Sequence, residues 1–143
     1  MKTIKQLLGN PPRAPISVAP GDSVIHALRV MAEQDIGAVV VMDDNKLIGI
    51  FSERDYARKV VLKGKNSTDT RVGDIMTEKV CYVSPDLKVD EVMALMTEKR
   101  VRHVPVLDSH LNVVAIVSIG DLVKDTISEQ AFQIRQLEQY IAG

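Results

Sequence analysis

Residues 18–56 read VAPGDSVIHALRVMAEQDIGAVVVMDDNKLIGIFSERDY, and residues 83–122 read VSPDLKVDEVMALMTEKRVRHVPVLDSHLNVVAIVSIGDL. The two stretches align at an offset of 65 residues, which becomes 66 after one extra residue near Leu111. Each contains an apolar helical segment, two β-like runs and a closing Ser-x-x-Asp. A unit this small cannot bury its own apolar faces, so the duplication predicts two halves packed with pseudo-twofold symmetry and related clefts between them.

Both copies predict the same order of elements. In the first copy we expect Asp22 to cap a helix, followed by strands at 38–42 and 46–51 and a helix from 53 to about 62. In the second copy a helix starts near Asp86, strands follow near 104–107 and 113–117, and Ser118 caps a helix from Ile119. The segments 3–9 and 72–77 form a duplicated lead-in to these elements.

The polar, turn-forming segment 64–71 marks the best boundary in the chain. We therefore predict a first repeat with its lead-in at 1–65, a second repeat at 66–128 and a helical tail at 129–143. Apolar residues recur in the tail at spacings of four, three, three and four, namely at Ile127, Ala131, Ile134, Leu137 and Ile141. Such a stripe suits packing against another helix, either of the same chain or of a second one.

Composition narrows the function. The 143 residues are 45% hydrophobic but only 3% aromatic, and the formal net charge is −1. This balance predicts a folded core and disfavours nucleic-acid binding, which needs a basic surface. Cys81 is the single cysteine, and neither zinc-ligand spacing nor an apolar signal or membrane-spanning run occurs in the sequence. We expect a cytoplasmic protein with no metal and no membrane partner.

The two Ser-x-x-Asp segments, Ser52 to Asp55 and Ser118 to Asp121, each stand where a buried strand passes into a helix. A helix start offers backbone N–H groups and a positive dipole end to a phosphate, and a serine hydroxyl adds a donor. An aspartate in the first turn can accept hydrogen bonds from ribose hydroxyls, so the pattern fits half a nucleotide. The alternative is a capping box that stabilises only the helix start.

Cationic residues near these segments have two interpretations. Arg54 lies inside the first Ser-x-x-Asp, and Arg102 and His103 open the first strand of the second copy. An arginine there can neutralise phosphate, or it can be a solvated charge at a strand edge with His103 simply packed or exposed. Arg58 and Lys59, one turn after Arg54, are expected on a solvated face.

Four stretches together resemble a tandem pair of cystathionine-β-synthase (CBS) domains: VSPD at 83–86, RVRHVPVLD at 100–108, VAIVSIGDL at 114–122 and IGIFSERDY at 48–56. The chain is most similar to small stand-alone bacterial CBS-pair proteins linked to signal transduction. The resemblance implies an α/β (α+β) fold of two β-α-β-β-α repeats, here with an added C-terminal helix. It also implies adenosine-containing ligands, such as AMP, ADP, ATP, NAD or S-adenosylmethionine, bound between the repeats.

The resemblance also implies two composite clefts. One combines the ribose-binding aspartate and phosphate-side serine of the first copy with the adenine wall of the second, and its residues are Ser52, Arg54, Asp55, Val101, Arg102 and His103. The other is its counterpart, made of Ser118, Gly120, Asp121, Ile36, Gly37 and Ala38. Because the two arginines of the first cleft are replaced by glycines in the second, we expect polyphosphate to bind more tightly in the first. Arg13 is a further cation that can serve the second cleft.

These observations predict a regulatory module without catalysis that binds an adenine nucleotide and forms a homodimer acting on an unknown effector. An enzyme is the second functional class, with Ser52 or Ser118 as the nucleophile. Such a serine needs a base within hydrogen-bond reach, and the candidates are His26, His103 and His110. A structural adaptor with empty clefts, working through its dimer surface and tail, is the third.

Overall fold

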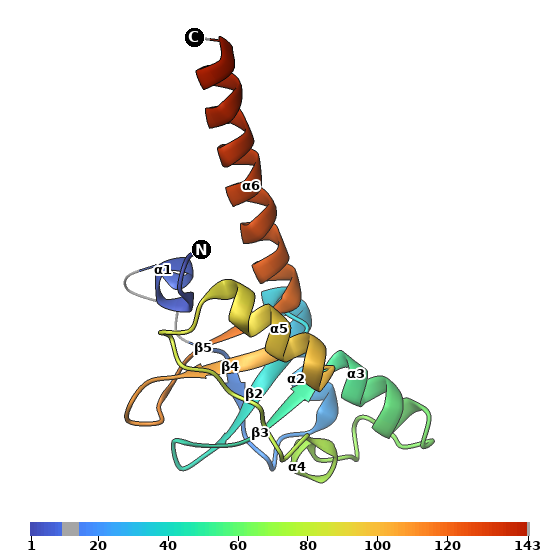
Figure 1. Cartoon of the computed structure of the whole chain (residues 1–143). Coiled ribbons are helices and arrows are strands. Elements are labelled where there is room, and N and C mark those ends of the chain that lie inside the picture. The colour runs from blue at the N-terminus through green and yellow to red at the C-terminus, as the bar shows by residue number, and fades with distance from the viewer. Residues whose placement is uncertain (10–14, 143) are drawn as a thin grey trace.

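The two copies of the repeat form the same series of helices and strands (Figure 1). The computed structural model describes residues 1–9 and 15–142. The first copy contains β1 (Ser17–Val18), α2 (Val24–Gln34), β2 (Ala38–Asp43), β3 (Lys46–Ser52), α3 (Glu53–Asp55) and the π-helix η1 (Tyr56–Val61). The second contains α5 (Val89–Lys99), β4 (His103–Leu107), β5 (Val113–Ser118) and α6 (Ile119–Ala142). The predicted fold of two packed repeats followed by a C-terminal helix is confirmed.

Each copy pairs its strands in the same register. In the first sheet β1 runs parallel to β2, with Val18 opposite Val41, and β2 runs antiparallel to β3. In the second sheet β4 and β5 are antiparallel, and a parallel bridge between Val83 and Val106 takes the place of β1. Both residues of this bridge lie 65 positions after their counterparts, so the offset read in the sequence is also the structural offset.

The hairpin turns explain where the two copies differ in length. Asp44 and Asn45 turn β2 into β3 with φ of 48° and 63°, the left-handed pair that a two-residue type I′ turn requires. The turn between β4 and β5 is longer, and Leu111 has a φ of 64° there. The extra residue of the second copy is therefore absorbed in a turn, where it leaves the strand register intact.

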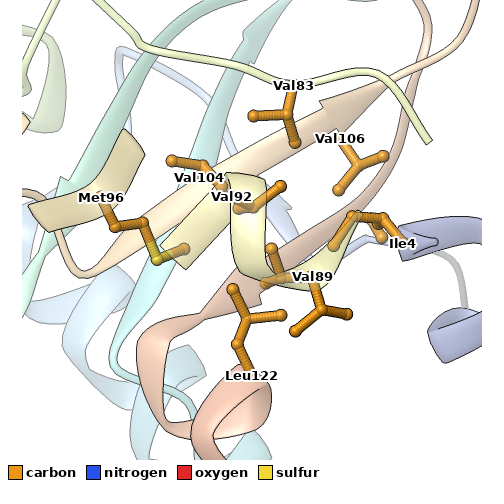
Figure 2. Packing of buried hydrophobic residues seen from close by; sticks show 10 residues of the cluster. Ile4, Val83, Val89, Val92, Met96, Val104, Val106 and Leu122 are labelled. Carbon is orange, nitrogen blue, oxygen red and sulfur yellow. The ribbon is translucent and has the colours of Figure 1, made fainter. Parts of the chain in front are cut away.

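The lead-in segments are exchanged between the copies. Helix α1 (Ile4–Leu8) comes before the first copy but packs on the second, where the Ile4 N–H donates to the Leu87 carbonyl at 2.8 Å. Helix α4 (Val72–Ile75) packs on the first copy, and the Val72 N–H donates to the Asp22 carbonyl at 2.9 Å. Figure 2 shows Ile4 among the buried side chains of the second copy. Each hydrophobic core thus includes a piece of chain from outside its own repeat.

Three details differ from the sequence prediction. Ser23, and not Asp22, caps α2, because the Ser23 hydroxyl accepts from the His26 N–H while the Asp22 carboxylate accepts from the Ala19 N–H. The helix expected over 53–62 is a three-residue α-helix followed by η1.

The tail is the third difference. Helix α6 leaves the body of the molecule and its C-terminal half extends away from it (Figure 1). Ile127 is 60% exposed and Leu137 is 62% exposed, so the apolar stripe is not covered by the chain's own described residues. Packing of the stripe within the chain, one of the two predicted alternatives, is wrong.

The exchanged lead-in makes an N-terminal residue essential to the second core. We predict that Ile4→Ala, which empties a fully buried site, lowers the free energy of unfolding by about 2–4 kcal/mol. Urea denaturation followed by circular dichroism measures this loss, with exposed Lys5→Ala as the matched control. A loss below about 0.5 kcal/mol, the usual range for surface substitutions, would show that α1 does not hold the core together.

Candidate functional site

A cavity of about 450 Å³ lies between the two copies. Its volume is in the range of pockets that hold small organic ligands. The first copy and the segment after it contribute Gly37, Ile50, Ser52, Glu53, Arg54, Asp55, Arg58, Lys59 and Thr77. The second copy contributes Arg100, Val101, Arg102 and His103. All six residues predicted for the first cleft are therefore brought together around one cavity.

The Asp55 carboxylate is the centre of the cavity wall. It is only 8% exposed and is the one buried charged residue in the part of the chain that the structure describes. Its Oδ2 accepts from the Ser52 N–H at 3.0 Å and from the Ser52 hydroxyl at 3.1 Å. Its Oδ1 accepts from the Thr77 hydroxyl at 3.1 Å and pairs with Lys59 Nζ at 3.1 Å. These four donors compensate the cost of burying the charge.

The predicted capping box is present at both helix starts. The Asp55 N–H donates to the Ser52 hydroxyl at 3.2 Å, and the Asp121 N–H donates to the Ser118 hydroxyl at 3.1 Å. The Glu53 N–H is also taken, by the Gly37 carbonyl at 3.1 Å. In two of the three residues of α3 the backbone N–H is already hydrogen-bonded, so the expectation of free N–H groups at this helix start is wrong for them. An anion bound here would therefore be held mainly by cationic side chains.

Positive charge dominates the cavity wall. Five of its lining residues are cationic and two are anionic, a formal surplus of three positive charges. The Arg54 guanidinium crosses from one copy to the other and donates to the Arg100 carbonyl at 2.9 Å. This bond holds the guanidinium in the cavity wall and connects α3 to the end of α5. Lys59 is half-buried in the wall, which corrects the prediction that it lies on a solvated face.

His103 lies at the junction between the two copies. A Cβ atom on Gly37 would come within 3.1 Å of His103 Nε2, so the missing side chain lets the imidazole approach the first copy. Burial lowers the pKa of His103 below its ordinary value of 6.5, and the nearby Arg102 charge lowers it further. The carboxylates of Asp121 and Glu53 oppose this shift.

The second predicted combination is not assembled in the same way. Ser118 and Asp121 are joined in their capping box, but Asp121 is exposed, and Ala38 is 1% exposed within β2. Ile36 and Gly37 line a separate cavity of about 490 Å³ with residues of α2 and α3. Neither this cavity nor the one around Asp55 is lined by Ser118, Gly120 or Asp121. Arg13 lies outside the described residues.

Six lining residues were not among those predicted for either cleft, namely Ile50, Glu53, Arg58, Lys59, Thr77 and Arg100. Ile50 is two residues before Ser52 on β3, so strand alternation alone places both on one face. Lys59 is four residues after Asp55, the spacing of side-chain pairs along a helix. Thr77 had no local signal, because it reaches Asp55 only through the docking of its segment on β3, where the Thr77 N–H donates to the Ile50 carbonyl at 2.9 Å.

The described residues offer neither a metal site nor a membrane-spanning helix. Among the described residues no group of three or more His, Cys, Asp or Glu side chains is placed to hold a metal ion. None of the helices in the described ranges is both long and apolar enough to cross a membrane.

Comparison with known proteins identifies the architecture. A family model for the CBS domain matches residues 5–62 and 72–127. The protein CBSX3, mitochondrial, of Arabidopsis thaliana contains CBS domains and is 41% identical over 127 residues. That match covers 85% of this chain and 61% of the Arabidopsis protein. The chain spans 56% of the length of a second relative, MK0525 of Methanopyrus kandleri, so it corresponds to part of each of these two relatives.

Solved structures give the same result. A protein with CBS domains from Burkholderia ambifaria superimposes with a TM-score of 0.85 at 49% identity, covering 90% of this chain and 96% of that chain. The CBS domain pair of protein MJ0100, in complex with 5-methylthioadenosine and S-adenosyl-L-methionine, superimposes with a TM-score of 0.79 at 27% identity. This second match covers 90% of this chain and 98% of that chain.

The lowered pKa of His103 predicts a pH dependence of stability. Because the unfolded chain binds the His103 proton at a higher pH than the folded protein does, stability falls as the pH drops below 6.5 towards the folded pKa. His103→Gln should reduce the slope of the free energy of unfolding against pH between pH 7 and pH 5. The change in slope is at most about 1.4 kcal/mol per pH unit, the limit for one proton.

Urea titrations of both proteins at a series of pH values measure this slope. At pH 8, where neutral imidazole prevails in both states, the difference in stability between the two proteins should stop changing with pH. Parallel curves over the whole range would show that burial of His103 does not couple its protonation to folding.

Proposed function

The chain belongs to the CBS domain family, and on that basis we propose that it is a non-catalytic regulatory module that binds an adenosine-containing nucleotide between its two repeats. The observation that carries the proposal is the cavity of about 450 Å³ that brings the buried Asp55 carboxylate together with arginines from both copies. The ligands considered are AMP, ADP, ATP and NAD. Binding would change the packing of the repeats and so signal to a partner.

Each part of the cavity has chemistry for one part of a nucleotide. We assign ribose recognition to the Asp55 carboxylate, whose oxygens are natural acceptors for sugar hydroxyls. Val101 and Ile50 supply an apolar wall for the adenine ring. Arg54 and Arg102, from opposite copies, supply positive charge for phosphate. The adenosyl ligands of the MJ0100 complex support this class of ligand.

The absence of catalysis is part of the proposal. The Ser52 hydroxyl donates to the Asp55 carboxylate and accepts from the Asp55 N–H, so its hydrogen bonds serve the helix start. His26 is exposed on α2 beside Asp22, and His110 lies in the turn after β4. His103 lines the same cavity as Ser52, but the hydrogen bonds of the Ser52 hydroxyl are made with Asp55. A nucleophile needs a base within hydrogen-bond reach, so this arrangement favours binding over turnover. A reducing cytoplasm remains our assignment, based on the single Cys81.

Binding should depend on the two aspartates unequally. We predict that Asp55→Ala weakens ATP binding at least tenfold, because the ribose loses a charged acceptor, whereas Asp121→Ala changes it less than threefold. Isothermal titration calorimetry measures both. Asp121→Ala is a matched control, since each substitution removes the same capping box and only Asp55 lines the cavity.

Equal losses from the two substitutions would refute the unequal clefts. Failure of the wild-type protein to bind any adenine nucleotide, in calorimetry and in thermal shift alike, would favour the second candidate function. That candidate is a ligand-free adaptor that acts through its dimer surface, and the exposed stripe on α6 is the observation that favours it.

For the partner of that stripe we propose a second copy of the chain. The spacings of four, three, three and four read the same in both directions from Ile134. Two antiparallel α6 helices crossing at Ile134 would place Ile127 opposite Ile141 and the small Ala131 opposite the large Leu137. The same arrangement is compatible with either candidate function, and the effector protein is unknown.

The tail therefore predicts a dimer that a single charge can weaken. Ile134→Glu should raise the dimer dissociation constant at least tenfold, because it buries an unpaired carboxylate at the centre of the contact. Analytical ultracentrifugation over a range of concentrations measures this. Gln136→Glu adds the same charge on the opposite side of α6 and should have little effect. A wild-type protein that stays monomeric, or dimers insensitive to Ile134→Glu, would contradict the proposed contact.

A further inference from the structure

The Asp55 carboxylate has no acceptor position left for a ribose. An ionised carboxylate offers about four lone-pair positions on its two oxygens. Here Ser52 supplies two donors, and Thr77 and Lys59 supply one each, all between 3.0 and 3.1 Å from an Asp55 oxygen. A ligand that donates its ribose hydroxyls to Asp55 must therefore displace one of these donors.

Lys59 is the donor that can leave. The Ser52 donors are fixed by the capping box at the start of α3. Thr77 is held by paired backbone hydrogen bonds with Ile50, at 2.9 and 3.0 Å. Lys59 instead reaches Asp55 at the end of a flexible four-carbon stem, and its side chain is 41% exposed. It can move towards solvent or towards the cavity without breaking backbone pairing, losing besides the Asp55 pair only a long hydrogen bond of 3.4 Å to the Thr77 hydroxyl.

The displaced ammonium needs a new counter-charge. When the Lys59 ammonium leaves Asp55, it remains in a cavity wall that already carries the cations Arg54, Arg58 and Arg102. Like charges that line one cavity repel one another, so this position is unfavourable for the ammonium unless an anion is present. A phosphate that arrives together with the ribose supplies the missing negative charge. A neutral nucleoside or a cationic sulfonium ligand supplies none.

We propose that Lys59 is a specificity-determining residue that makes this cavity select adenosine ligands carrying a phosphate over uncharged or cationic ones. In the unliganded protein Lys59 occupies the ribose acceptor. In the complex it exchanges Asp55 for the ligand's phosphate oxygens, so that ribose binding and phosphate binding become one coupled event. The inference rests on the proposed function and deepens it by naming the ligand class.

The second copy supports the assignment by contrast. The residue 66 positions after Lys59 is Asp125 in α6. Its carboxylate pairs with the ammonium of Lys2, which comes just before α1, at 2.9 Å. The second Ser-x-x-Asp is therefore followed by a carboxylate where the first is followed by an ammonium. Among the described residues, an ammonium stands four positions after the aspartate only in the first Ser-x-x-Asp, so the coupling is proposed for the first cleft.

The test compares AMP with adenosine by calorimetry on the full chain. In the wild type AMP should bind at least tenfold more tightly than adenosine. Lys59→Met keeps most of the stem but removes the charge, so AMP affinity should fall about tenfold. Adenosine affinity should rise about threefold, since no ammonium has to be displaced from Asp55. The ratio of AMP to adenosine affinity should therefore fall about thirtyfold.

Two further variants distinguish the effect of the Lys59–Asp55 ion pair from the effect of the total positive charge of the cavity wall. Arg58→Met removes a cation from the same wall without touching the Asp55 pair, and should weaken AMP with no gain for adenosine. Lys59→Arg retains the charge and should retain the preference for AMP. Circular dichroism and thermal melts establish that each variant is folded, and Lys59→Arg keeps the test open if Lys59→Met is not.

The outcomes distinguish the inference from the function on which it rests. If the wild type binds AMP but Lys59→Met leaves the ratio of AMP to adenosine affinity unchanged, the role of Lys59 is wrong and the nucleotide site stands. The role of Lys59 is equally wrong if Lys59→Arg, with its charge kept, loses the preference. If the wild type binds neither ligand at millimolar concentration, both the site and the inference fail.

Discussion

The buried carboxylate of Asp55 is the interaction on which the site depends. A charge at 8% exposure is tolerated only when its oxygens are hydrogen-bonded, and the four donors come from three different segments. Ser52 belongs to the strand end, Lys59 to η1, and Thr77 to the chain that follows the first repeat. Satisfying one buried charge therefore fixes the strand, the helix and the docked segment relative to one another, and the cavity lies where they meet.

Duplication gave the chain two such helix starts, and divergence has left them unequal. The lead-in exchange and the strand register are the same in both copies, because they are set by backbone pairing and apolar burial. Charged side chains are not so constrained. Arg54 corresponds to Gly120, and Lys59 corresponds to Asp125, which holds Lys2 and so anchors the N-terminal segment to α6. The first helix start lies in a cationic cavity wall, whereas the residue that matches Lys59 in the second copy helps to fix the fold.

Local patterns predicted what depends on local physics. The 65-residue offset predicted the paired sheets, and the Ser-x-x-Asp pattern alone identified Ser52 and Asp55 as site residues. Strand alternation could have predicted Ile50, and the four-residue spacing of side chains along a helix could have predicted Lys59. Thr77 was not, because its contact with Asp55 spans 22 residues and depends on how a connecting segment docks. The π-helix over Tyr56–Val61 was not predicted either, because this rare hydrogen-bonding pattern has no propensity signature in the sequence.

The geometry also suggests how a small ligand could be felt at a distance. Arg102 lines the cavity, and its carbonyl accepts from the N–H of Ile119 at 2.8 Å, the first residue of α6. That helix is one continuous element of 24 residues, so a rotation at its first turn is carried along its whole length. If the proposed nucleotide binds in this cavity and the proposed dimer forms through the stripe on α6, this helix would connect the two sites directly.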